Sequence, residues 1–199
     1  MIADATHRIE RLLRTEQWMR AHRLIYKHLA REPLDHWLWA RLALTYYEAK
    51  DYKRAHEASS QAVELAPGCP LALWEYAGAL SMLGKHREGK RVYVRLIRRG
   101  AVRIARGPCG EGLGRARSLV NDCRYRVAFC CWAVGESSEA VRYLRAYLRA
   151  RERRVWSIYR VADVRRELRD YLGALKGAKQ GVLRQRRGLG GPPPGAVGA

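Results

Sequence analysis

Cysteine and histidine are the side chains of this 199-residue sequence best suited to metal binding or nucleophilic chemistry. Three of the five cysteines, Cys123, Cys130 and Cys131, follow one stripe of a helix at i, i+7 and i+8. Thiolates bind zinc, but this spacing spreads the sulfurs over two turns, and the sequence has no Cys-x-x-Cys pair. The odd number of cysteines favours reduced thiols that pack as small apolar residues. We therefore expect no metal site.

The sequence contains no residue order typical of an active site. Its six histidines are spaced as on helix surfaces, and neither a Ser-His-Asp order nor a His-Glu-x-x-His motif occurs. The paired carboxylates Glu136 and Glu139 stand at a turn and the start of a helix, where capping is their ordinary role. These observations predict a protein that is not an enzyme and uses no cofactor.

One glycine- and arginine-rich stretch has a composition that suits anion binding. A glycine-rich turn at the start of a helix exposes backbone N–H groups to a phosphate, and flanking arginines add bidentate contacts. The stretch lacks the phosphate-loop order and no strand precedes it, so a plain connection between two helices is the other interpretation. The candidate anion ligands are Arg98, Arg99, Arg103, Arg106, Arg115 and Arg117.

The charge of the chain is strongly positive and unevenly distributed. The net charge is +20, of which residues 1–90 contribute +3 and residues 91–199 contribute +17. Such asymmetry favours a polyanionic partner for the second half, such as nucleic acid. However, 32 of the 39 basic residues are arginine, which the codon usage of a GC-rich genome would also produce. Functional and compositional origins of the charge both stay open.

The sequence pattern that should position these residues repeats every 34 residues. Small residues recur at Ala21, Ala55 and Gly89, and prolines recur at Pro33 and Pro67. The clearest copy, 36–69, carries aromatic, small and helix-ending residues at fixed positions: Trp39, Leu42, Ala43, Tyr46, Tyr52, Ala55, Ala62 and Pro67. This pattern resembles the tetratricopeptide repeat (TPR), a pair of antiparallel helices.

The resemblance implies an all-α helical-repeat solenoid of about four antiparallel helix pairs plus a C-terminal capping helix. We place copies near 2–35, 36–69, 70–103 and 121–154, with a Gly/Arg-rich insertion near 100–120. The apolar pattern predicts helices at about 4–14, 17–31, 36–49, 52–65, 70–83, 86–99, 113–134 and 137–152. Residues 155–175 should form the cap, with its helix at 161–175. Residues 176–199, which are basic and then Gly/Pro-rich, should be a disordered tail.

The resemblance also implies a concave groove that binds a protein or peptide partner, so we expect an adaptor or scaffold. The alternative is a protein that binds nucleic acid, such as RNA, through its basic second half. The sequence contains no apolar segment of membrane-spanning length and no secretory signal, so we expect a cytoplasmic protein without membrane contact. The predicted groove residues are Trp37, Arg41, Leu44, Tyr47, Glu48, Trp74, Glu75, Met82, Tyr125, Arg126, Phe129 and Trp132.

Overall fold

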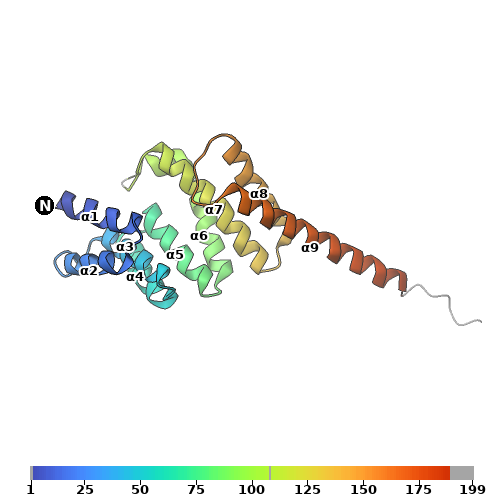
Figure 1. Ribbon diagram of the computed structural model, residues 1–199, viewed down its shortest axis with the longest axis horizontal. Coiled ribbons are helices and arrows are strands. Elements are labelled where there is room, and N and C mark those ends of the chain that lie inside the picture. Colours follow the sequence, from blue (N-terminus) through green and yellow to red (C-terminus); the bar gives the residue numbers. More distant parts are fainter. Residues whose placement is uncertain (1, 108, 189–199) are drawn as a thin grey trace, which may run out of the picture.

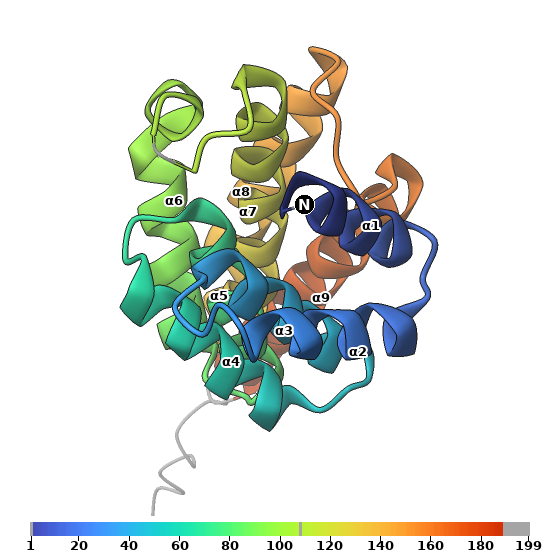
Figure 2. The same cartoon turned by 90° about the vertical axis from the view of Figure 1, so that its left-hand side faces the viewer.

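Within residues 2–107 and 109–188, which the computed structural model describes, the chain forms nine helices and no strand. This confirms the predicted all-α repeat architecture. None of the described helices is long and apolar enough to cross a membrane. The helices are α1 (Ile2–Arg14), α2 (Trp18–Leu29), α3 (His36–Glu48), α4 (Tyr52–Leu65), α5 (Pro70–Met82), α6 (His86–Ala105), α7 (Leu113–Ala133), α8 (Ser137–Glu152) and α9 (Val161–Gly188). Successive helices pack against one another from the blue end to the red end of the molecule (Figure 1, and from its left-hand side in Figure 2).

Each helix hairpin turns through one residue in the left-handed backbone region. Glu16, Lys50, Gly84 and Gly135 have φ values of 55°, 61°, 78° and 81°. The next N–H reaches back to a carbonyl of the last helical turn, as from Lys85 to Leu80. This is the Schellman arrangement that ends helices. The first three of these turns are 34 residues apart, so the sequence period is also a period of the backbone.

Close helix approach explains the small residues of the repeat. Ala21 and Ala55 are buried, and their helices α2 and α4 pack against neighbouring helices. At the third position, a β-carbon on Gly89 would lie 2.5 Å from Ser81 Oγ and 3.0 Å from the Ala77 carbonyl oxygen. The α5–α6 pair is therefore packed so closely that only glycine fits there without movement.

Two expected boundaries are wrong. The helix predicted at 86–99 ends later than expected, because α6 continues through a kink at Gly100 (φ 75°, ψ 155°) and ends at Ala105. The tail predicted from residue 176 is helical up to Gly188, and this part of α9 extends beyond the other helices (Figure 1). Leucine, lysine, glutamine and arginine are good helix formers, and no proline interrupts the segment before Pro192. The rest of the predicted tail, 189–199, lies outside the described residues.

Candidate binding groove

A groove of about 750 Å³ lies between the first helices of three successive repeats and two connecting segments. Its walls are mainly apolar, with polar side chains at a few positions. Helix α3 provides Arg41 and Leu44, α5 provides Leu71, Trp74 and Glu75, α7 provides Ala116, Ser118, Leu119 and Asp122, and the segment between α8 and α9 provides Trp156 and Ile158. Ile104 and Cys109 line the groove from the end of α6 and the loop that follows.

Two carboxyl groups are buried in this groove. Glu75 is 6% exposed, and burial raises its pKa to about 7 against the opposing effect of Arg41. Burial also raises the pKa of Asp122 to about 7, although hydrogen bonds from Ser157 and the Ile158 backbone oppose the shift. Arg41 forms an ion pair with Glu10 of α1 at 2.5 Å. Within the described chain, no ion pair joins Glu75 to a basic side chain. A cation placed in the groove would stabilise the charged form of each carboxyl group.

One wall of the groove is the irregular segment between α8 and α9, which hydrogen bonds of Ser157 hold in place. Ser157 is buried and donates a hydrogen bond to the Asp122 carboxylate, and the Tyr147 hydroxyl lies 2.7 Å from Ser157 Oγ. Trp156 and Ile158 on either side of it are 65% and 56% exposed. The hydrogen bonds to Ser157 therefore fix two large apolar side chains at the surface of the groove.

A half-buried arginine joins three helices of different repeats. Arg126 of α7 donates from Nη2 to Tyr47 Oη of α3 and from Nε to Tyr93 Oη of α6, both at 3.1 Å. A β-carbon on Gly78 of α5 would lie 3.5 to 3.8 Å from all three side chains, which is ordinary van der Waals contact, so the cluster packs against this position of α5. The Tyr47–Arg126–Tyr93 cluster is thus part of the packing between repeats.

The predicted groove residues occupy different environments. Arg41, Leu44, Trp74 and Glu75 line the groove. Trp37 lies in a separate cleft against α1, while Glu48 and Met82 are exposed near the ends of their helices. Three of the α7 side chains pack against aromatic neighbours instead of lining the groove: Tyr125 against Tyr159, Phe129 against His86, and Trp132 in a 3.7 Å stack with Tyr171 of α9.

The predicted anion ligands do not converge on one site. Arg99 donates to the Gly68 carbonyl, Arg115 pairs with Glu111 at 2.9 Å, and Arg98, Arg103 and Arg106 are exposed. Arg117 lines a different cleft of about 450 Å³ beside the Gly100 kink, together with Arg124, Arg149 and Arg153. None of these four arginines forms an ion pair with a carboxylate of the described residues. Burial, and next the charge of Arg149, lower the pKa of Arg124.

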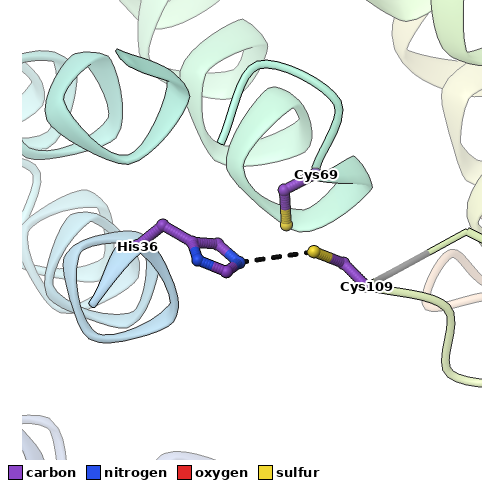
Figure 3. A group of neighbouring side chains, drawn as sticks. All are labelled: His36, Cys69 and Cys109. Atoms are coloured by element: carbon purple, nitrogen blue, oxygen red, sulfur yellow. Dashed lines mark hydrogen bonds between the residues drawn. The ribbon is translucent and has the colours of Figure 1, made fainter. Parts of the chain in front are cut away.

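The structure brings together one group of potential ligands that sequence spacing did not predict. Cys123, Cys130 and Cys131 are buried in the core, as expected. In contrast, His36, Cys69 and Cys109 meet at one edge of the groove, with Cys109 Sγ 3.3 Å from His36 Nε2 (Figure 3). Their positions in the sequence carry no local signal, because His36 and Cys109 are 73 residues apart.

No protein-family model and no curated protein sequence matches the chain. Solved structures do match its fold. A putative kinesin light chain with nearly identical TPR-like repeats from Podosopora anserina is 16% identical, with 94% of each chain covered and a TM-score of 0.63. MamA from residue 41 to its end, from Desulfovibrio magneticus RS-1, is 13% identical over 94% of this chain and 96% of that chain, with a TM-score of 0.57. The chain therefore has a TPR-type fold.

Proposed function

We propose that the protein is a non-enzymatic scaffold that binds a segment of a partner protein in the groove between α3, α5 and α7. The observation that carries this proposal is an open, mainly apolar groove with large side chains fixed at its surface. Tryptophan and arginine contribute most of the binding energy in many protein interfaces. Trp74, Trp156 and Arg41 supply both residue types to the groove.

The chemistry of the groove defines the partner segment further. Bulky apolar side chains would fit against Leu44, Leu71 and Ile158, where burial contributes about 25 cal/mol per Å² before ordering costs. A lysine or arginine beside them would face Glu75 and Asp122. The proposed ligand is therefore a short segment with bulky apolar residues next to a basic residue.

Selection from a random peptide library displayed on phage tests this proposal. The purified chain should enrich peptides of that composition. Trp156→Ala and Ile158→Ala should each weaken binding of a selected peptide about tenfold or more, because both side chains are exposed in the groove. Met19→Ala and Leu34→Ala are the controls, since these apolar side chains are similarly exposed outside the groove. Selected peptides that bind all four variants equally would refute the groove assignment.

The cleft of four arginines favours a second function, binding of a phosphate-rich polyanion such as RNA. Arg117, Arg124, Arg149 and Arg153 face this cleft without carboxylate partners in the described chain. Guanidinium groups bind phosphate in bidentate geometry.

Fluorescence anisotropy with labelled single-stranded RNA and duplex DNA tests the second function. Each phosphate neutralised on duplex DNA adds about −0.9 to the slope of log K against log salt concentration. The double variant Arg124→Gln/Arg149→Gln should reduce affinity and slope together. Arg98→Gln/Arg103→Gln, which removes two exposed charges elsewhere, is the matched control. Binding that responds equally to both variants would contradict a role of the cleft.

A further inference from the structure

We propose that His36, Cys69 and Cys109 form a binding site for a thiophilic divalent cation, with Zn²⁺ as the expected ion. The three ligand atoms lie within 4.8 Å of one another, and they come from the start of α3, the start of α5 and the loop after α6 (Figure 3). The site would be additional to partner binding and does not depend on it.

The separation of Cys109 Sγ and His36 Nε2 is close to that of two ligands of one tetrahedral zinc ion. With Zn–S of about 2.3 Å and Zn–N of about 2.1 Å, a sulfur and a nitrogen ligand lie about 3.6 Å apart. Cys109 Sγ and His36 Nε2 are separated by 3.3 Å, so a small outward movement would admit the ion. Three protein ligands leave a fourth position for water, and Cys109 also lines the open groove.

Cys69 stands where the preceding repeat has a capping residue. Asp35, 34 positions earlier, accepts hydrogen bonds from the N–H groups of Trp37 and Leu38 at the start of α3. The side chain of Cys69 makes no such bond at the start of α5, and it is only 3% exposed. Aspartate is among the best capping residues, whereas cysteine is not. A ligand role gives this thiol a function that capping does not.

The loop that carries Cys109 is held close to the other two ligands. A β-carbon on Gly110 would lie 2.2 Å from the Ala105 carbonyl oxygen, so the loop packs tightly against the end of α6. Arg99 of α6 donates to the Gly68 carbonyl, which joins α6 to the turn before Cys69. Cys69 and Cys109 also share an apolar cluster with Ala40, Ala62 and Ala72. These contacts place both sulfurs in a partly dehydrated environment.

In a second group of potential ligands, the carboxylates are already paired with a lysine. Cys131, Glu136 and Glu139 lie equally close together, but the Lys90 ammonium forms ion pairs with both carboxylates. Glu139→Gln is therefore a suitable control, because it removes a potential ligand from this second group alone.

Cobalt titration of the full, reduced chain tests the proposal, because thiolate–Co²⁺ bonds absorb strongly in the near ultraviolet. We expect one equivalent of Co²⁺ to produce this absorption and Zn²⁺ to abolish it by displacement. Cys109→Ser and Cys69→Ser should each reduce the absorption, because one thiolate remains in each variant, and the Cys69→Ser/Cys109→Ser double variant should lose it. His36→Ala should weaken Co²⁺ affinity by more than the roughly 10- to 100-fold that the loss of an outer-shell partner costs. His28→Ala and Glu139→Gln should bind as the unchanged chain does. Circular dichroism checks that each variant remains helical. Cys109 lies partly exposed in a loop, so its substitution should disturb the fold least.

Two results would overturn the site. One is the absence of the thiolate absorption in the reduced, helical chain. The other is an absorption that persists in the Cys69→Ser/Cys109→Ser double variant, which would assign the metal to other cysteines.

Discussion

Arg126 and Tyr47 are joined by a hydrogen bond of 3.1 Å across 79 residues of sequence, from the fourth repeat to the second. Replacing Arg126 by Met should lower the free energy of unfolding by about 2 kcal/mol, because the hydroxyl groups of buried Tyr93 and half-buried Tyr47 lose their donor. Tyr47→Phe should cost about 1 kcal/mol. Urea unfolding of both variants and of the double variant measures the coupling, expected at about 1 kcal/mol. Additive effects would mean that this bond contributes nothing.

The buried Glu75 carboxyl group predicts a pH-dependent stability. Its pKa is raised from 4.5 to about 7 by burial, so the folded chain holds this proton over a range in which the unfolded chain has released it. The stabilising contribution is therefore complete below about pH 4.5 and is lost as the pH rises to about 7. Between about pH 5 and about pH 8, the urea midpoint of unfolding should fall less for Glu75→Gln than for the wild-type protein. The exposed Glu64→Gln control should keep the full dependence.

Gly89→Ala should destabilise the protein although alanine is the better helix former. The added methyl group would meet Ser81 Oγ at 2.5 Å, and overpacking of this kind costs about 1–3 kcal/mol. Gly114→Ala is the control, since nothing lies within 4 Å of that position in α7. Gly114 lies in the first turn of α7, so this control should be unchanged or gain less than the roughly 1 kcal/mol typical of a helix interior. Thermal unfolding in which both variants change in the same direction would contradict the close packing of α5 and α6.

The hairpin turn at Lys50 is a site for stabilisation. Its φ of 61° is unfavourable for any residue with a β-carbon, whereas glycine occupies the matching turn at Gly84. Lys50→Gly should raise the unfolding temperature by about 2–4 °C, equivalent to about 1 kcal/mol. Gly84→Ala should lower it by a similar amount, because its φ is 78° and no steric contact opposes the methyl group. A decrease for Lys50→Gly would show that the lysine side chain contributes more than the strain costs.

The hydrogen bonds of Ser157 should control the order of the groove wall. Ser157→Ala removes the donor to Asp122 and should speed amide hydrogen exchange in residues 155–160. A peptide selected for the groove should then bind more weakly, because Trp156 and Ile158 lose their fixed positions. Ser138→Ala, an exposed serine at the start of α8, is the control. Unchanged exchange would mean that other contacts hold the segment.

The repeat period contained most of the information about the fold. Residues such as Ala55, Pro67 and Gly89 locate the hairpins, and the first five helices begin and end within two residues of their predicted bounds. The α6 extension could not be predicted, because Gly100 interrupts the apolar pattern while the chain continues as helix on its far side. The continuation of α9 through residues 176–188 was missed, because a basic, glycine-containing composition was interpreted as disorder.

The site was predicted less completely than the fold, because the site depends on packing between segments far apart in the sequence. Positions on α3 and α5 that the repeat pattern assigns to a groove do line one, as for Leu44 and Trp74. The pattern could not show that Tyr171 stacks on Trp132, since this depends on how α9 returns to α7. The wall formed by Trp156 and Ile158 lies outside the repeat and has no counterpart in it.

The bond from Arg126 to Tyr47 and the contact of Cys109 with His36 both bypass one repeat. In an ideal repeat array each unit touches only its neighbours, so stability is a sum of local contributions and parts of the array unfold separately. Here the second repeat is joined directly to the fourth repeat and to the loop that precedes it. Opening the middle of the array must break these links as well, which favours concerted unfolding over a series of partly folded states.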